Sequence, residues 1–200
     1  MMSVMQKAKR SASPRKAVTH ERIVESAARA IRRSGYNGTG VADIMKDAGV
    51  THGGFYAHFA SREAMLAEAA IRAGAESTNT LSRLVAAAAT PEALQTLLRA
   101  YLSKTHLERV ESGCPIAALA SEIPRQAPEV RRVATRHIKE LIDLVGRQLP
   151  DWGRVGAHEQ ALVIVSTMVG ALMLARAVDD PKLADAVCKA ALKHLTSTKD

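Results

Sequence analysis

The most constraining feature of this sequence is a regular alternation between helix-breaking residues and segments whose apolar side chains recur every three or four positions. One such segment starts after Thr19 and ends at Gly35. Its residues Ile23, Ala27 and Ile31 share one helix face. No stretch alternates apolar and polar residues as a half-buried strand does, and Ala and Leu are abundant. The sequence therefore predicts an all-α protein of about nine helices.

Capping residues and prolines set the limits of the predicted helices. Thr19, Thr51 and Ser61 are suitable N-caps, and Asp180 followed by a proline is another. Gly113 ends one apolar pattern and starts the break before a short helix. The predicted helices cover residues 19–34, 41–48, 51–59, 62–88, 90–112, 115–123, 128–149, 158–178 and 180–195.

Two of these helices, 41–48 and 51–59, are short and flank an Ala-Gly-Val turn, which is the form of a helix-turn-helix. The formal net charge is +8, yet residues 1–62 hold 11 Lys and Arg against 4 Asp and Glu. A basic module on a nearly neutral body indicates a polyanion partner for that module, although a solvated basic face is the simpler alternative. The predicted divisions are a disordered basic arm at 1–17, a helix-turn-helix domain at 18–62 and a helical body at 63–200.

The sequence also disfavours several classes of protein. Its two cysteines are far apart, so they form no disulfide framework and no metal-binding pair, and they fit a reducing cytoplasm. The N-terminal residues lack the apolar core of a signal peptide. The longest apolar run covers residues 161–175 and contains Ser166 and Thr167, which makes a buried helix more plausible than a membrane span. We expect no membrane association and no cofactor.

The segment 48–63, with the sequence AGVTHGGFYAHFASRE, concentrates aromatic and histidine side chains in a chain that is otherwise poor in aromatics. A metal site is disfavoured because His52 and His58 are six residues apart and do not share a helix face. Catalysis is disfavoured because no carboxylate is placed to orient a histidine. Packing explains Phe55 and Phe59, four residues apart, but it does not explain Tyr56. The pattern therefore favours a surface that contacts a partner.

Residues 19–66 resemble the DNA-binding domain of the TetR/AcrR family of bacterial regulators. The resemblance spans nearly fifty residues, and two positions depart from it: Arg62 replaces the usual lysine, and Gly40 replaces a better helix former. The matching positions are Gly35-Tyr36, Thr39, Asp43-Ile44, Ala48-Gly49-Val50, Tyr56, His58-Phe59 and Ser61-Arg62-Glu63.

The resemblance implies that phosphates are contacted from one side of the second short helix and that base edges are contacted from its start. The implied phosphate contacts are Tyr56, His58 and Arg62, with Thr39 and Thr51 as helpers, and the implied base-edge contacts are His52, Gly53 and Gly54. The basic arm reaches an adjacent groove or attracts DNA only diffusely; its charged residues are Lys7, Lys9, Arg10, Arg15 and Lys16.

A homodimer is expected from both the family and the sequence. The segment 158–178 is apolar nearly all round, so one small domain cannot easily cover it, although a buried central helix in a monomer is the alternative. The resemblance places the dimer contact in the last two helices, about 158–178 and 180–195. Two recognition helices related by a two-fold axis would read a palindromic double-stranded operator.

The resemblance also implies an effector pocket among the middle helices. Polar or soft residues on otherwise apolar helices are the candidates for lining it, although ordinary packing is the alternative for each. Cys114 immediately precedes a proline that starts a helix, a position that favours thiolate, although a buried inert thiol is the alternative. The candidate residues are Tyr101, His106, Cys114, Trp152, Met168 and Arg176.

These observations predict a cytoplasmic, homodimeric repressor that a small-molecule effector releases from its operator. In the expected mechanism, the effector favours a body conformation in which the helix beginning at Arg62 swings the two DNA-binding heads away from the spacing of the major groove. The first alternative is a thiol-based redox or electrophile sensor that uses Cys114. The second is an enzyme that retains a helix-turn-helix, but the sequence offers no acid–base pair, phosphate loop or metal set, so we expect no enzyme.

Overall fold

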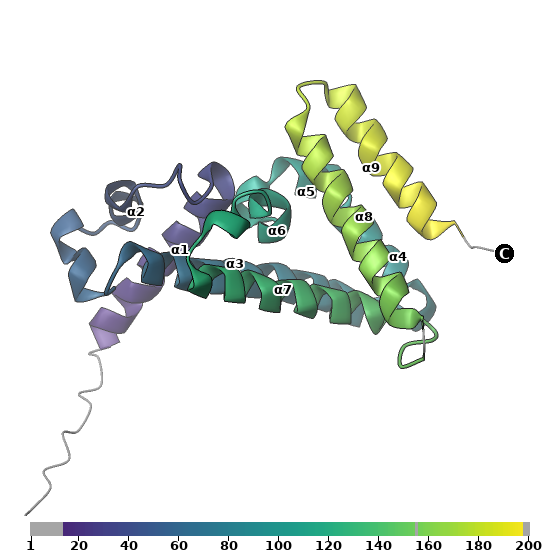
Figure 1. Cartoon of the computed structure of the whole chain (residues 1–200), viewed down its shortest axis with the longest axis horizontal. Helices are drawn as coiled ribbons and strands as arrows, with labels where there is room; N and C mark the ends of the chain where they lie inside the picture. The colour runs from purple at the N-terminus through teal and green to yellow at the C-terminus, as the bar shows by residue number, and fades with distance from the viewer. Residues whose placement is uncertain (1–13, 155, 198–200) are drawn as a thin grey trace, which may run out of the picture.

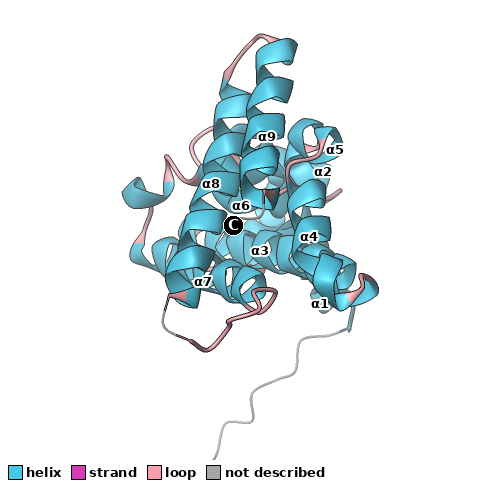
Figure 2. Cartoon of the chain, turned by 90° about the vertical axis from the view of Figure 1, so that its right-hand side faces the viewer, coloured by secondary structure: helices cyan, strands magenta, loops and turns pink. Residues whose placement is uncertain are grey.

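The computed structural model describes residues 14–154 and 156–197, and every regular element in these ranges is a helix (Figures 1 and 2). The all-α prediction is confirmed. The α-helices are α1 (Pro14–Ser34), α2 (Val41–Asp47), α3 (Arg62–Ala87), α4 (Ala93–Tyr101), α5 (Lys104–Glu108), α6 (Pro115–Leu119), α7 (Pro128–Gly146), α8 (Ala157–Ala177) and α9 (Pro181–Thr196), and the 3₁₀ turns are η1 (His52–Ala57), η2 (Thr90–Glu92), η3 (Val110–Ser112) and η4 (Ile123–Arg125).

Two apolar cores hold the helices together. The first lies in the head, which we define as α1, α2, η1 and the start of α3; it includes Ile23, Ile44 and Phe55. The second lies in the body and includes Leu97, Leu141 and the buried residues of α8. Helix α3 passes from the head into the body, where it packs along α7, and α8 and α9 form a pair at the far end (Figure 1). Because α3 packs in both the head and the body, a movement of α3 displaces contacts in both parts.

Several helix limits differ from the predictions. Helix α6 ends at Leu119 and α7 at Gly146, earlier than the predicted ends at 123 and 149. Helix α1 begins at Pro14, so the predicted start at Thr19 is wrong; the Thr19 hydroxyl instead donates 3.0 Å to the Arg15 carbonyl within the helix. Residues 1–13 of the predicted arm lie outside the described residues. The predicted helix 90–112 is divided because the Ser103 side chain accepts from the His106 amide at 3.1 Å and starts a new helix. A further difference, at η1, is described with the site below.

Two predicted N-caps are confirmed, at the starts of α3 and α9. Ser61 Oγ accepts from the Ala64 amide at 3.2 Å at the start of α3. Asp180 accepts from the Lys182 and Leu183 amides at 2.8 and 3.3 Å at the start of α9. Each cap satisfies backbone donors that a helix end leaves free.

Helix α8 is the one helix in the described ranges whose length and composition match a membrane span. Its apolar window is 44% buried inside the protein. Ile164, Met168 and Leu172 all lie in the body core. The helix therefore packs as a core element of the body, and its outward apolar residues need a separate explanation.

A buried histidine lies between α3 and α7. His137 is 4% exposed, and a Cβ added at Gly74 would lie only 3.1 Å from its ring. Its Nδ1 atom lies 3.3 Å from Thr78 Oγ1 and 3.8 Å from a Glu140 oxygen. Burial lowers the pKa of His137 below its ordinary value of 6.5, and Glu140 opposes that shift less strongly. The ring is therefore neutral at pH 7.

Acidification is expected to destabilise the protein through His137. Because the folded-state pKa is below that of the unfolded chain, the stability it contributes is present above about pH 6.5 and is lost as the pH falls. The free energy of unfolding should drop by at most about 1.4 kcal/mol per pH unit from this group. Urea denaturation at pH 7.5 and 5.5 measures the drop. His137→Gln should reduce it, and His158→Gln, at the exposed start of α8, should not; equal slopes in all three proteins would contradict the prediction.

Candidate nucleic-acid interface and effector cavity

The turn between α2 and η1 is held by a glycine and an arginine. Gly49 has φ +66°, a conformation that residues with a Cβ rarely adopt. Arg22 of α1 reaches this turn and donates 2.6 Å to the Ala48 carbonyl. Together they fix the turn that joins α2 to η1, the turn of the helix-turn-helix.

Two phenylalanines hold η1 against the other elements of the head. Phe55 and Phe59 are each 3% exposed, and their rings stack with centroids 5.6 Å apart. The sequence predicted a helix over 51–59, but the structure has only a six-residue 3₁₀ helix, and Thr51 makes no side-chain cap. Gly53 and Gly54 explain the difference, because glycine is a poor helix former. The segment is therefore positioned mainly by its aromatic anchors.

Tyr56 points away from this core. Its ring packs edge-on against Phe55 at 5.1 Å, yet the residue is 78% exposed. His52 and Gly53 are exposed beside it, and a Cβ added at Gly53 would meet nothing within 4 Å. Thr51 is also exposed, while Gly54 is half-buried against Val50. These residues form one outward surface, which we call the η1 face: Thr51, His52, Gly53, Gly54 and Tyr56.

His58 adjoins the η1 face at a group of stacked rings. His20 stacks on Phe59 at 4.6 Å and lies 5.9 Å from the His58 ring. His20 Nε2 is also 2.6 Å from a Glu68 oxygen, which joins α1 to α3. Burial, followed by the charges of His20 and Lys16, lowers the pKa of His58. Its Nδ1 is buried without a hydrogen-bond partner in the described ranges, so Nε2 is the ring nitrogen directed outward.

Thr39 and Arg62 make contacts inside the head. Thr39 is 5% exposed, and its hydroxyl lies 2.7 Å from the Gly35 carbonyl and 3.2 Å from that of Ala30. Arg62 Nη2 donates to the carbonyls of Tyr36 and, at 3.1 Å, Thr39. The Thr39 hydroxyl is thus directed to the backbone rather than to the outside. Arg62 fastens the start of α3 to the turn between α1 and α2.

A cavity of about 300 Å³ lies in the body between α3, α4 and α5. Three of the predicted ligand-binding residues line it: Tyr101, His106 and Cys114. His106 Nδ1 lies 2.6 Å from the Tyr101 carbonyl, and its Nε2 accepts from the Cys114 amide at 2.9 Å. The residues that line the cavity are Ser77, Thr80, Leu81, Leu84, Ala100, Tyr101, Ser103, Thr105, His106, Arg109, Ser112, Gly113 and Cys114.

Arg176 supports this cavity from α8. Its guanidinium donates to the carbonyls of His106 at 2.6 Å and Leu107 at 3.3 Å. A Cβ at Gly113 would lie 2.9 Å from Arg176 Nη2 and 2.8 Å from His106 Nε2, so only glycine fits there without a shift. The Cys114 thiol is free and 1% exposed. Its reactivity stays a prediction.

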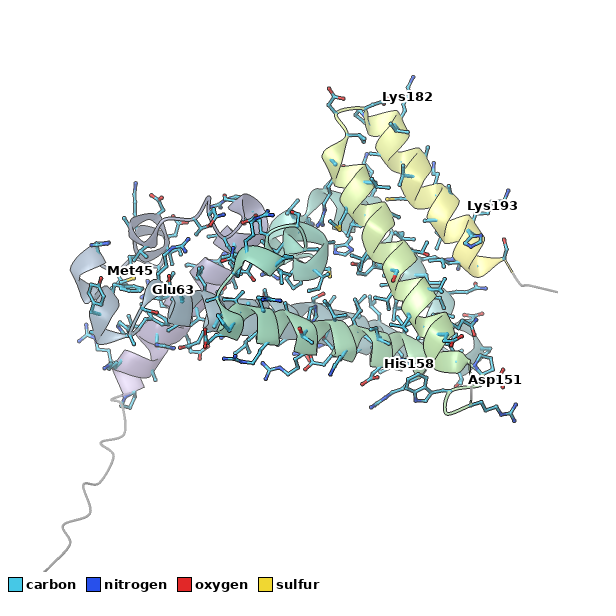
Figure 3. The ribbon with its side chains drawn as sticks, viewed as in Figure 1. Met45, Glu63, Asp151, His158, Lys182 and Lys193 are labelled. Atoms are coloured by element: carbon cyan, nitrogen blue, oxygen red, sulfur yellow. The ribbon has the colours of Figure 1, made fainter. Side chains whose placement is uncertain are left out.

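Two other candidates are not brought to the cavity. Met168 is fully buried in the body core. Trp152 follows Asp151 in the loop before α8, at the end of the molecule opposite Glu63 (Figure 3), and its ring covers Gly146. Neither residue lines the cavity described above. Among the described residues, no group of three or more His, Cys, Asp or Glu could hold a metal ion.

Sequence reasoning missed two side chains that join the head to the body. Arg32 of α1 is 3% exposed; it donates 2.6 Å to Glu76 of α3 and lies 3.4 Å from the Gly113 carbonyl. Glu122, after α6, accepts from the Tyr36 and Asn37 amides at 2.9 and 3.3 Å. A charged residue beside the apolar stripe of α1 was the only sequence signal for Arg32. No signal marked Glu122, because its partners are backbone groups.

The outward side of α8 and α9 carries exposed apolar side chains. Val163 and Leu174 are 59% and 62% exposed on α8, and Leu183 is 47% exposed on α9. Gly170 lies between the first two along α8, and a Cβ there would meet nothing within 4 Å. Exposed apolar side chains beside a glycine that leaves open space are typical of an association surface.

Comparison with known proteins agrees with this geometry. Residues 23–69 match the family described as "Bacterial regulatory proteins, tetR family", and residues 90–190 match "Transcriptional regulator LmrA/YxaF-like, C-terminal domain". The uncharacterized HTH-type transcriptional regulator Rv0196 of Mycobacterium tuberculosis is 31% identical over 169 residues, which are 78% of this chain and 83% of that protein.

Two further relatives support the match. The HTH-type transcriptional regulator LmrA of Bacillus subtilis is 26% identical over 157 residues, covering 78% of this chain and 82% of the relative. The crystal structure of a TetR transcriptional regulator from Chloroflexus aurantiacus superposes with a TM-score of 0.76 and 28% identity, covering 91% of this chain and 96% of the other. With a helix-turn-helix head, a helical body and these matches along most of its length, the chain belongs to the TetR family of transcriptional regulators.

Proposed function

We propose that this protein is a homodimeric repressor that binds a palindromic operator and leaves it when a small effector occupies the cavity. The observation that carries the proposal is the η1 face. Its anchors are buried, while Tyr56 is 78% exposed and Gly53 leaves open space at the surface. A duplex groove is contacted by such a slim surface with hydrogen-bond donors at its edge. Because the matched family is one of bacterial regulators, which act on chromosomal DNA, the proposal includes a cytoplasmic location.

Replacing Tyr56 with phenylalanine tests the η1 face. The change removes one exposed hydroxyl, so we expect an unchanged free energy of unfolding and about tenfold weaker binding to DNA, the effect of losing one hydrogen bond to a charged phosphate. The salt dependence of binding should stay the same because tyrosine carries no charge. Fluorescence anisotropy with a duplex from the region upstream of the gene measures the DNA affinity and its salt dependence.

Gly53→Ala is a second variant for the same surface. Since the added methyl group meets no protein atom, we expect normal folding, and any loss of affinity then reports close approach of the duplex. His158→Gln, far from the head, is the matched control and should bind DNA normally. Unchanged affinity in both Tyr56→Phe and Gly53→Ala would exclude the η1 face as the contact surface.

The connection between cavity and head supports an effector response. Gly113 and Cys114 line the cavity, and Arg32 of the head lies against the Gly113 carbonyl. Arg33 strengthens the same connection through an ion pair of 3.0 Å with Glu111 of η3. An effector that displaces the cavity wall would therefore act on α1 through these contacts. The free-energy difference needed between the two states is only about 1–3 kcal/mol.

The exposed apolar surface of α8 and α9 supports a homodimer. Val163, Leu174 and Leu183 would be covered by the same surface of a second copy, as a two-fold interface requires. The two heads would then present two η1 faces to one side of a duplex.

A further inference from the structure

A nearly buried hydroxyl in the wall of the cavity between α3, α4 and α5 has no hydrogen-bond partner in the described ranges. It belongs to Ser77 of α3, which is 7% exposed. The unpaired polar atoms that are wholly inaccessible belong to other residues, so the Ser77 hydroxyl keeps some accessible surface beside the cavity that Ser77 lines. Buried polar groups are nearly always paired. The partner of this hydroxyl must therefore come from the cavity.

Other polar groups of the wall are already paired or are not offered to a ligand. Thr80 Oγ1 donates 2.9 Å to a carbonyl of its own helix, α3. Both ring nitrogens of His106 lie against backbone groups of the wall, at 2.6 and 2.9 Å. The Tyr101 hydroxyl is inaccessible, so the cavity meets the ring of this tyrosine and not its oxygen. Ser77 therefore supplies a free donor and acceptor where solvent scarcely reaches.

The wall around the Ser77 hydroxyl is apolar. Leu81 and Leu84 follow Ser77 at helical spacing and line the same cavity, so the three residues share one face of α3. Ala100 and Tyr101 of α4 also line the cavity. The volume of about 300 Å³ is at the small end of ligand sites. The shape and lining suit a small apolar molecule with one polar atom directed at Ser77.

The charges of the wall disfavour an ionic ligand. The lining residues, all of them described, include no Asp or Glu, so a cation has no counter-ion there. The one cationic lining residue, Arg109, is exposed, and Arg176 does not line the cavity. Glu76, next to Ser77 in the chain, is already paired with Arg32 at 2.6 Å. A charge held at Ser77 would be buried without a partner, which is far more costly than burying a neutral oxygen that is hydrogen-bonded.

We propose that this cavity binds an uncharged, largely apolar organic molecule with one hydroxyl or carbonyl oxygen. The oxygen hydrogen-bonds to Ser77 Oγ, and the apolar part packs against Leu81 and Leu84. Because Ser77 follows Glu76, the α3 partner of Arg32, the bound molecule lies beside a contact that joins α3 to α1 of the head. The inference rests on the proposed function only in naming this molecule as the effector; binding itself requires no DNA.

Calorimetric titration of the full chain tests the ligand class with four probes built on one ring system: 1-naphthol, naphthalene, 1-naphthoate and 1-naphthylmethylammonium. We expect 1-naphthol to bind at least about tenfold more tightly than either charged probe. Ser77→Ala should weaken 1-naphthol about fivefold, the effect of losing one neutral hydrogen bond. It should leave naphthalene unchanged, because naphthalene has no oxygen to pair with the hydroxyl.

Two further variants locate the probes. Ser82→Ala removes another hydroxyl of α3, one that does not line the cavity, and should alter neither the 1-naphthol nor the naphthalene affinity. Ala100→Leu adds three carbon atoms to the wall contributed by α4 and narrows the cavity. It should weaken 1-naphthol and naphthalene alike, by about tenfold or more, because both lose the same space.

Four results would overturn the proposal: no binding of 1-naphthol, equal or tighter binding of a charged probe, an equal effect of Ser77→Ala on 1-naphthol and naphthalene, or unchanged affinities in Ala100→Leu. Thermal denaturation adds an independent readout. Ser77→Ala should leave the melting temperature unchanged or raise it, and a lower melting temperature would mean that the hydroxyl is already satisfied in the ligand-free fold. A chain that binds the duplex but not 1-naphthol would refute the ligand class alone; one that binds 1-naphthol but no duplex would refute the repressor alone.

Discussion

Phe55→Ala is expected to lower the free energy of unfolding by about 3–5 kcal/mol and to remove most DNA affinity. Phe55 is 3% exposed and is the buried residue of η1, which has no side-chain cap. Without its ring, the 3₁₀ segment loses the packing that holds Tyr56 and Gly53 at the surface. Urea denaturation followed by circular dichroism measures the stability, and duplex anisotropy measures the affinity.

Phe55→Leu is the matched control for this change. Leucine keeps most of the buried volume, so the loss should be about 1 kcal/mol, and duplex binding should persist. If Phe55→Ala bound the duplex as tightly as the unaltered chain, the aromatic anchor would not be what positions the η1 face.

Arg32→Met is expected to lower the free energy of unfolding by about 3 kcal/mol, the range typical when one partner of a buried ion pair is removed. The Arg32 side chain is 1% exposed, and its partner Glu76 is 36% exposed, so water compensates the carboxylate only in part. Methionine keeps an unbranched apolar stem but lacks the guanidinium, so it loses the bonds to Glu76 and to the Gly113 carbonyl. Chemical denaturation gives the loss directly.

Arg29→Met provides the comparison on the same helix. Arg29 pairs with Glu25 at 2.5 Å, but both side chains are at least 43% exposed, so its removal should cost less than about 1 kcal/mol. If Arg32→Met and Arg29→Met lowered the free energy of unfolding by similar amounts, burial of the Arg32 ion pair would add nothing to stability. Combining Arg32→Met with Glu76→Gln should recover part of the loss, because no buried charge is then left alone.

The fold and the helix-turn-helix head could be predicted because their signals are local. The spacing of Phe55 and Phe59, the turn at Gly49 and the cap at Ser61 each depend on neighbours in the chain. The η1 segment was predicted too long because its two glycines weaken a regular helix. The start of α1 was missed because Pro14 suits a first helical turn as well as a disordered arm.

The cavity was only partly predictable because it depends on contacts between distant residues. Tyr101, His106 and Cys114 lie within fourteen positions and do share the cavity. Met168 and Trp152 were chosen by residue type, which does not reveal which side of the body a residue occupies. Arg32 and Glu122 were missed because their partners lie 81 and 86 positions away and include backbone atoms.

Glu122 holds the turn at Tyr36 and Asn37 by their main-chain amides, and Arg32 meets Gly113 at its main-chain carbonyl. Neither attachment depends on the identity of the side chain at the other end. Asn37 is exposed, so its side chain can be exchanged while its amide still donates to Glu122. None of the residues of the η1 face takes part in either attachment, so substitutions on that face leave the link between head and body in place.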